Sequence, residues 1–317
     1  MASLPARAVG PFWKWAQRRL GLKKLPWLFL TPNLLSVICF SLLPVIINII
    51  YSVTGSDNLY LQDRRFIGSD NYSTLMDCQN YLDASSCSRD LFWRSLGNLL
   101  MFVPLQVIFM MGIALVTAVA LNGKIKARGF FRGVFFFPVM LSPVVVAMTW
   151  QWILQRNGLL NGILGFFGAE KFSWLADSNW AFFWVIFVTV WAHSGFFMII
   201  LLAGLQSIPG DVYEAAKMDK ASAWRVFSKI TVPMLRPVLL VVFILAVIRS
   251  VQTFDEIYVL TGGGPGSATM LLVQYIYETG FAAQPRNYGL AAAASLLLGA
   301  ALLIFTMIQM KISGGKK

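Results

Sequence analysis

Charged side chains are scarce in this chain of 317 residues. Asp, Glu, Lys and Arg make up 13% of it, against about a quarter in a soluble globular protein, and 57% of the residues are hydrophobic. Histidine occurs once, and the three cysteines include no C-x-x-C pair. These scarcities nearly exclude a zinc site built on histidine ligands, and they indicate a polytopic membrane protein.

A phosphate-binding loop is also lacking. The glycine-rich stretch TGGGPGSAT (261–269) is not followed by the Gly-Lys-Ser/Thr of a P-loop, and Pro265 interrupts it. We therefore predict a flexible turn there and no nucleotide site. No clustered acid–base or metal constellation is visible either, so we expect no catalytic residue, no metal and no cofactor in this chain.

Six apolar runs are long enough to cross a bilayer, which takes about 20 residues as a helix. Lipid offers no partner to open backbone groups, so all six are predicted to be helices. They occupy residues 27–53, 96–121, 133–154, 179–206, 237–260 and 287–312. The prediction is an all-α polytopic protein with a six-helix domain over 27–312 and an outer loop at 54–95.

The basic residues gather on one side of the predicted membrane. With the N-terminus inside, 18 Lys and Arg lie on the inner side and 7 on the outer side, while 11 of the 14 acids lie outside. This asymmetry fits the positive-inside rule, and it argues against nucleic-acid binding as the reason for the net charge of +12. It predicts cytoplasmic termini, with a basic arm at 1–26, an uncleaved first span and a tail at 313–317.

Two of the cysteines share the outer loop. Cys78 and Cys87 lie nine residues apart, whereas Cys39 lies within the first span. If the loop faces an oxidising compartment, Cys78 and Cys87 form a disulfide; the alternative is two free thiols.

A polar segment at 209–237 separates two long apolar runs. Asp211 and Glu214 have the spacing of a helix capping box, and a second helical pattern covers 222–231 before Pro233, which ends or kinks it. We expect a small apolar face on the first helix, formed by Tyr213, Ala216 and Met218. From patterning alone, two interpretations stay open: a hairpin that anchors the bundle to the membrane surface, and a docking element for a soluble partner.

The order Glu214-Ala215-Ala216, followed by Ile230-x-Val232-Pro233, resembles the EAA loop of ABC importer permeases. Lys220 stands where that signature has glycine, and Val232 where it has leucine. The lysine puts the turn geometry in doubt, because glycine takes positive φ more readily. Further pieces are similar to maltose-type carbohydrate permeases: Pro44, Phe66-x-Gly68-x-x-Asn71-Tyr72, Trp150, Gly158, Asn161, Asp219-Lys220-Ala221-Ser222, Phe254-Asp255, 261–265 and Tyr288-Gly289-Leu290-Ala291-Ala292.

The resemblance implies a type I importer permease of the bacterial cytoplasmic membrane, one half of a heterodimeric pore. Its expected partners are a second permease, two ATPase subunits that carry ATP and Mg²⁺, an external solute-binding protein, membrane lipid and a sugar-like solute. The loop at 207–236 would then be the element that couples the spans to the ATPase. Its expected contact residues are Asp211, Tyr213, Glu214, Ala215, Ala216, Met218, Asp219 and Lys220.

The resemblance also places solute contacts on the spans before and after that loop. The candidates are Thr189, His193, Phe196, Arg249, Ser250, Gln252 and Thr253. His193 is interpreted either as a hydrogen-bonded packing residue or as a cavity residue that contacts a sugar hydroxyl. Asp255 and Glu256 are assigned to a gate rim or a binding-protein contact.

Arg249 lies near mid-membrane, where an unpaired charge costs several kcal/mol. No acid lies three or four residues from it along the same helix. Two explanations stay open: a cation for an anionic solute such as glycerol phosphate or an acidic or sulfonated glycoside, and pairing with backbone carbonyls or with an acid of the partner permease. A stand-alone secondary transporter is the competing class, and it would usually show paired repeats, which the sequence lacks.

Overall fold

The computed structural model describes residues 27, 29–55, 58–81, 83–123 and 125–314. Within these ranges the regular structure is helical, apart from two isolated β-bridges. The predicted basic arm at 1–26 and the last residues of the tail, 315–317, lie outside the described residues. The long helices are α2 (Leu43–Ser52, the end of a span from Phe29), α4 (Asp90–Asn122), α8 (Ser178–Gln206), α11 (Val232–Val251) and α14 (Tyr288–Gly314).

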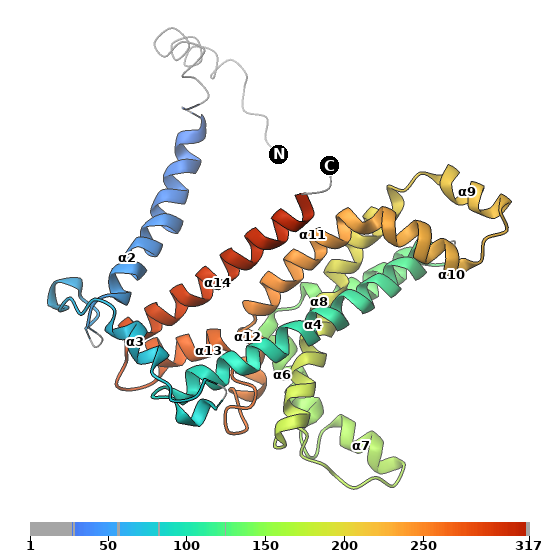
Figure 1. The fold of residues 1–317 in the computed structure, drawn as a ribbon. Coiled ribbons are helices and arrows are strands. Elements are labelled where there is room, and N and C mark those ends of the chain that lie inside the picture. The colour runs from blue at the N-terminus through green and yellow to red at the C-terminus, as the bar shows by residue number, and fades with distance from the viewer. Residues whose placement is uncertain (1–26, 28, 56–57, 82, 124, 315–317) are drawn as a thin grey trace, which may run out of the picture.

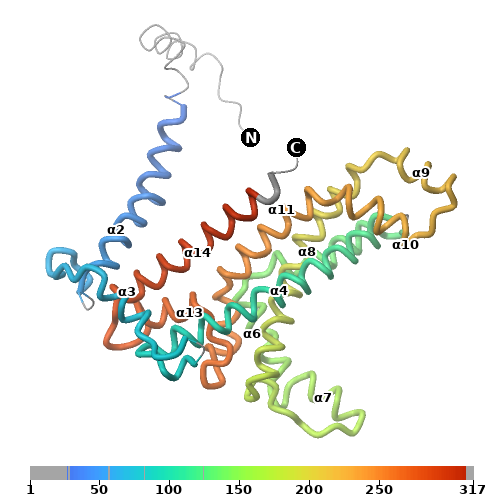
Figure 2. Tube along the Cα trace, in the orientation of Figure 1, coloured from blue at the N-terminus to red at the C-terminus, as the bar shows by residue number. Residues whose placement is uncertain are grey.

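Among the described residues, five helices are long and apolar enough to cross a membrane, and a bent helix pair makes up to six. The predicted all-α polytopic class is therefore confirmed. Figure 1 shows α4, α8 and α11 running side by side, α14 next to them, and α2 at the edge of the bundle. The tube in Figure 2 shows the same arrangement, with α2 splayed away from the other long helices.

The third predicted span is not one straight helix. Its first part consists of α5 (Arg128–Phe136) and η4 (Phe137–Met140), and its second part begins with α6 (Pro143–Leu154), continues to α7 (Leu159–Phe166) and lies at 98° to the first. The expectation of a continuous helix over 133–154 is corrected here. Proline has no N–H to donate, and Ser142 before Pro143 has the extended backbone that a following proline favours (ψ 137°).

Close backbone contacts hold the central helices together. A Cβ on Gly195 of α8 would lie 2.0 Å from the carbonyl oxygen of Phe135, and one on Gly204 would lie 2.8 Å from Cδ1 of Leu235. On α4, Ala114 and Ala118 are fully buried. Small residues at these positions let neighbouring helices approach closely, which is how helices associate in lipid.

Side chains that accept from free backbone N–H groups mark where helices begin. Oδ1 of Asp177 accepts from the N–H groups of Asn179 and Trp180, each at 3.0 Å, at the start of α8. Oδ1 of Asn287 accepts from the N–H of Leu290 at 2.8 Å, at the start of α14. Such caps satisfy donors that have no partner within the helix.

The glycine-rich stretch after α12 (Asp255–Thr261) is held by hydrogen bonds. Asn98 of α4 donates to the carbonyl oxygens of Ser267 (2.8 Å) and Met270 (3.0 Å), and the hydroxyls of Thr261 and Thr269 lie 2.7 Å apart. The expectation of a flexible turn is therefore corrected to a loop with defined contacts. The following helix, α13 (Leu272–Tyr277), continues into η6 (Glu278–Ala282) and packs on α14.

The outer loop is also folded. It contains α3 (Asp70–Met76), and the buried Asn71 donates to the carbonyl oxygen of Ser52 at 2.8 Å. The structure joins Cys78 and Cys87 by a disulfide. Trp93 donates to the carbonyl oxygen of Leu75 at 2.9 Å, so the loop is tied to the start of α4.

Candidate functional site: a central cavity and an exposed coupling loop

A cavity of about 430 Å³ lies where the broken third span meets α8, α11 and α12. Irregular backbone at membrane depth is tolerated where it lines such a cavity, which accounts for the break between Pro138 and Pro143. The lining residues are Pro138, Val139, Leu141, Pro143, Val146, Ala192, His193, Phe196, Phe197, Leu245, Ile248, Arg249, Gln252 and Glu256.

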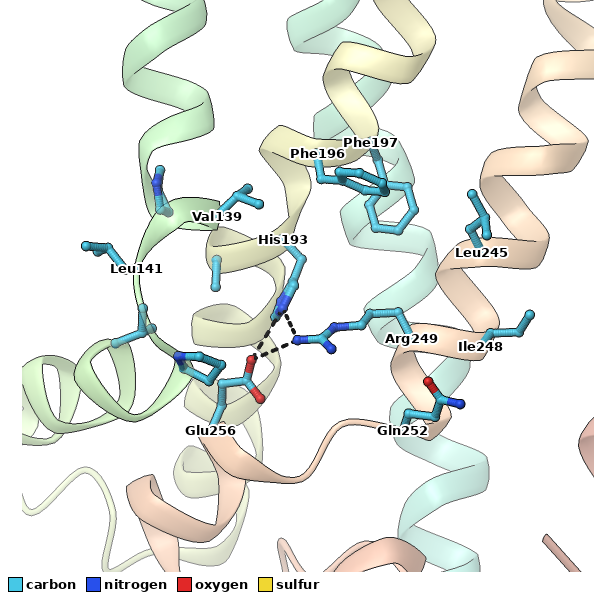
Figure 3. A pocket seen from close by; sticks show the side chains of 14 residues that line it. Val139, Leu141, His193, Phe196, Phe197, Leu245, Ile248, Arg249, Gln252 and Glu256 are labelled. Atoms are coloured by element: carbon cyan, nitrogen blue, oxygen red, sulfur yellow. Dashed lines mark hydrogen bonds and ion pairs between the residues drawn. The ribbon is translucent and has the colours of Figure 1, made fainter. Parts of the chain in front are cut away.

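Three polar side chains from three helices converge in this cavity, as Figure 3 shows. Nη2 of Arg249 (α11) lies 2.6 Å from Nε2 of His193 (α8) and 3.4 Å from Oε1 of Glu256 (α12). Nε2 of His193 lies 3.3 Å from the same carboxylate oxygen. We call these three residues the polar cluster.

The contacts of His193 define its tautomer. Its Nδ1 lies 2.9 Å from the carbonyl oxygen of Thr189, which can only accept, so Nδ1 carries the proton. Nε2 of His193 lies 2.6 Å from the guanidinium of Arg249, which can only donate, and 3.3 Å from the carboxylate of Glu256, which can only accept; the shorter contact is with the donor, so Nε2 accepts from Arg249. In this arrangement the imidazole is neutral, and the ion pair of the cluster is Arg249 with Glu256.

Burial within the cluster is uneven. The side chain of Glu256 is 3% exposed and that of His193 14%, whereas Arg249 keeps 42% of its side-chain surface exposed. The buried carboxylate is therefore compensated, while the guanidinium still faces the cavity. Since Arg249 and Glu256 have opposite charges, the cluster as a whole is neutral.

Two sequence-based assignments are corrected by this geometry. Glu256 was assigned to a gate rim, yet it is buried against Arg249, whereas its neighbour Asp255 is exposed. Arg249 pairs neither with an acid on its own helix nor with backbone carbonyls but with Glu256 of the same chain. The acid is seven residues further along the same chain, beyond the end of α11 at Val251, where the chain turns into α12.

The structure brings four of the seven candidate solute-contact residues to the cavity wall: His193, Phe196, Arg249 and Gln252. The other three are Thr189, Ser250 and Thr253, and they lie buried outside it. The hydroxyl of Thr189 donates to the carbonyl oxygen of Val185 (2.8 Å), and that of Thr253 to Arg249 (3.0 Å), so both are satisfied within their own helices. These three side chains therefore lie away from the cavity wall in this structure.

At the opposite end of α8, the loop at 207–236 projects from the bundle as α9 (Gly210–Met218), followed by α10 (Ala223–Val226) and η5 (Phe227–Thr231) (Figure 1). The exposed face of α9 carries Asp211, Glu214, Ala215 and Met218, the last of which is 84% exposed. Asp219 and Lys220, just after the helix, are also exposed.

The predicted apolar face of α9 is corrected. Ala216 is buried and Tyr213 half-buried, and the Tyr213 hydroxyl lies 3.3 Å from that of Thr231, so both residues face the bundle. Met218 points to the other side of α9. Residues on one face of a helix are three or four apart, whereas Met218 is five residues from Tyr213 and two from Ala216. Tyr213 thus fastens α9 to the segment that leads into α11.

The predicted capping box does not form either. Pro209 is the residue that precedes α9, and no side chain caps this end, although Asp211 lies in the first turn, where a negative charge is favoured. Pro233 does not end the second helix. A single helix runs over Ala223–Val251, and its π-helical segment η5 lies just before the proline.

The turn after α9 has the left-handed conformation of a glycine turn, although Lys220 stands where the family signature has glycine. Lys220 has φ of +49°, the left-handed region that glycine adopts without steric cost. The N–H of Ala221 donates to the carbonyl oxygen of Ala216 at 3.0 Å and closes the turn. Lys220 therefore adopts the left-handed conformation at a cost of about 1–2 kcal/mol, and the turn is retained.

One polar contact near the loop was not anticipated. With its amide oxygen turned toward α5, Gln206 at the end of α8 accepts from Nη2 of Arg128 (2.8 Å) and of Arg132 (2.9 Å). The two arginines are four residues apart, so they lie on one face of α5. This spacing was the signal available in the sequence.

A membrane-spanning helical bundle with a polar cavity at its centre and a small helix projecting from one end defines a membrane transport component. The chain belongs to the family of inner membrane components of binding-protein-dependent transport systems, whose pattern matches residues 110–314. The predicted resemblance to importer permeases is thereby confirmed.

Several relatives match over almost the whole chain. The trehalose/maltose transport system permease protein MalF of Thermococcus litoralis is 35% identical, with 91% of this chain and 93% of that protein covered. The lactose transport system permease protein LacF of Rhizobium radiobacter is 32% identical, with 89% and 92% covered. The arabinooligosaccharides transport system permease protein AraP of Bacillus subtilis is 30% identical, with 96% and 93% covered.

The fold also matches a solved structure. A chain in the crystal structure of a bacterial ABC transporter, involved in the import of the acidic polysaccharide alginate, superimposes with a TM-score of 0.79 at 22% sequence identity. The match covers 97% of this chain and 100% of that chain. The ABC importer permease fold is therefore confirmed.

Proposed function

We propose that this chain is the permease subunit of an ATP-driven importer and moves a neutral sugar across the cytoplasmic membrane by alternating access. The observation that carries the proposal is the polar cluster, a neutral set of hydrogen-bonding groups at the wall of a cavity. The transport systems of the relatives named above, for trehalose and maltose, lactose and arabinooligosaccharides, support a saccharide as the solute.

The pairing of Arg249 with Glu256 favours a neutral solute over an anionic one. An anionic sugar would have to compete with a carboxylate that lies 3.4 Å from the guanidinium and is itself 3% exposed. Displacing Arg249 would leave Glu256 buried without its cation, which costs several kcal/mol. The anionic alternative is therefore the weaker candidate.

A sugar hydroxyl needs donors and acceptors, and the cavity offers both. Arg249 keeps donors on its exposed side, and Gln252 adds an exposed amide with a donor and an acceptor. Phe196, 43% exposed, provides an apolar face. A cavity of about 430 Å³ that combines apolar walls with a few polar groups is typical of small-molecule sites.

Transport would be driven through α9. In the proposal, a second permease completes the pore, an external binding protein delivers the sugar, and two ATPase subunits bind ATP and Mg²⁺. The face of Asp211, Glu214, Ala215 and Met218 lies against an ATPase subunit, with both termini on the same cytoplasmic side. Movement of that subunit reaches the cavity through α11, as a rigid-body change and not a chemical step.

Reconstitution tests the proposal. The complete transporter in liposomes, with its binding protein outside and ATP inside, is offered trehalose, maltose and lactose, together with glycerol 3-phosphate and glucuronic acid as anionic solutes. We expect ATP-dependent uptake of at least one neutral sugar and of neither anion. Uptake confined to an anion, or accumulation without ATP, would contradict the proposal.

A further inference from the structure

Six aromatic residues with contacting rings form a row and come from the segments α2, α12, α13, η6 and α14, including the residue just before α12. Figure 1 shows α12, α13 and the start of α14 at the end of the bundle opposite α9. Neighbouring ring centroids are 5.1–6.5 Å apart, the range in which aromatic side chains contact one another. Three of the members, Tyr258, Phe254 and Tyr277, contact one another, and the row continues from Tyr277 through Phe281 and Tyr288 to Tyr51.

The aromatic row begins close in the sequence to the central cavity and ends at a second cavity. Phe254 is two residues from both Gln252 and Glu256, which line the central cavity. At the other end Tyr51, Phe281 and Tyr288 line a second cavity of about 440 Å³ between α2, η6 and α14. None of the six rings is buried; Phe281 is 59% exposed.

Polar groups accompany the rings of this second cavity, which we call the outer cavity. Asn48 donates to the hydroxyl of Ser295 at 2.8 Å, and both residues line it. The guanidinium of Arg64 lies 4.2 Å from the ring centre of Tyr51. Exposed rings beside amide and hydroxyl groups suit a pyranose, whose C–H faces pack on the negative face of an aromatic ring while its hydroxyls form hydrogen bonds.

A third cavity shows what a site for a lipid chain would look like. It has about 480 Å³ and lies between α4, α11 and α14, where Leu, Val and other apolar side chains make up its wall. Of the residues that line it, none has a polar side chain. The outer cavity differs in having the amide of Asn48 and the hydroxyls of Ser295, Tyr51 and Tyr288 in its wall, so its chemistry favours a polyhydroxyl ligand over an acyl chain.

We propose that the outer cavity is a second binding subsite for a neutral pyranose, and that the aromatic row leads the sugar from it to the central cavity. This inference rests on the proposed function, because the ligand is the solute of the transporter. Neighbouring rings of the row lie 5.1–6.5 Å apart, so a sugar that leaves one ring meets the next within the length of a pyranose.

Fluorine NMR tests the subsite directly. In the complete transporter in nanodiscs, 4-fluorophenylalanine replaces Phe281 in one sample and Phe196, in the central cavity, in another. The probe is methyl α-D-glucopyranoside, and mannitol, which has hydroxyls but no ring, is the control. We expect a saturable shift at both positions with the glucoside alone, and loss of the shift at position 281, but not at 196, in Tyr288→Leu.

The two reporters separate the failure of this inference from that of the proposed function. A response at 196 without one at 281 would overturn the outer subsite and leave the sugar function standing. The outer subsite would also be overturned if mannitol shifted the signal at position 281 as much as the glucoside does. The same holds if a change of lipid chain length, without sugar, produced that shift. If the glucoside shifted neither signal, the result would count against the sugar function as a whole, and therefore also against the subsite.

Uptake kinetics provide an independent arm. For the neutral sugar that the reconstituted transporter takes up, we expect Phe281→Leu to raise KM about 3- to 10-fold, since it removes the ring but keeps the bulk. Phe281→Tyr keeps the ring and restores KM to near the original value. Phe166→Leu is the matched control, an 88% exposed ring on α7 outside the row, and it leaves KM unchanged. An unchanged KM in Phe281→Leu would contradict the proposal.

Discussion

The central cavity and the exposed face of α9 handle their charges in opposite ways. In the cavity, Arg249 finds its carboxylate within the same chain, on Glu256, and the carboxylate is buried. On α9, Asp211 and Glu214 are exposed beside an 84% exposed Met218. The difference teaches that the cavity is assembled by this chain's own fold, whereas the α9 face has the mixed acidic and apolar surface that a partner can cover.

The largest expected effect follows from breaking the ion pair of the cavity. Glu256→Gln leaves the guanidinium of Arg249 without its carboxylate at membrane depth, and we expect loss of transport and about 3 kcal/mol of stability. The double variant Arg249→Gln/Glu256→Gln removes both charges and should recover most of that stability but not transport. Thermal unfolding in detergent measures the stability of both variants, and uptake into proteoliposomes measures their transport.

Asp255→Asn is the control for that comparison, since Asp255 is the exposed neighbour of Glu256. It should leave unfolding unchanged. If Glu256→Gln were as stable as the unmodified protein, the pairing would not hold the cavity together.

Reversing a charge on α9 should abolish function without affecting the fold. Glu214→Lys changes an exposed side chain, so we expect the unfolding temperature to stay within the range of surface substitutions, while ATPase co-purification and uptake are lost. Glu170→Lys makes the same charge change at an exposed site outside the loop and serves as the control. Full uptake by Glu214→Lys would remove α9 from the coupling path.

The helix that joins the two regions depends on a close contact. Gly195→Ala places a methyl group 2.0 Å from the carbonyl oxygen of Phe135, so α8 and the broken span must separate, at a cost of about 1–3 kcal/mol. Gly165→Ala is the matched control, because no described atom lies within 4 Å of its added Cβ. Thermal unfolding that is equal in both variants would contradict this packing.

The smallest expected effect concerns the turn after α9. Lys220→Gly should stabilise the protein by about 1 kcal/mol, since glycine adopts φ of +49° without strain. Lys217→Gly, within α9, should destabilise it by about as much, because glycine is a poor helix former. Opposite signs in thermal unfolding support the observed turn, and equal signs would contradict it.

Much of the architecture could be predicted from the sequence. The apolar runs and the charge asymmetry identified the spans, because lipid requires helices about 20 residues long. The break at Pro138 and Pro143 was missed, since the apolar run continues through it and hydropathy does not register the missing N–H groups. The left-handed turn at Lys220 was doubtful because its local sequence disfavours it, and tertiary contacts decided otherwise.

The site was harder to predict, because its residues come from three separate helices. His193 and Arg249 were candidates, yet their contact depends on how α8 and α11 pack. Glu256 was overlooked as the partner of Arg249 because helical spacing does not extend past the end of α11. Thr189 and Thr253 share the correct helices with the cluster, but each hydroxyl is turned to its own backbone.

The proposed function requires the cavity to open alternately to the two sides of the membrane. A cysteine introduced as Gln252→Cys, in a Cys39→Ser background, reports the accessible side when a membrane-impermeant thiol reagent is added outside or inside proteoliposomes. We expect labelling from the inside in the resting transporter, and from the outside once ATP and the loaded binding protein are trapped on it. Labelling from the same side in both states would contradict alternating access.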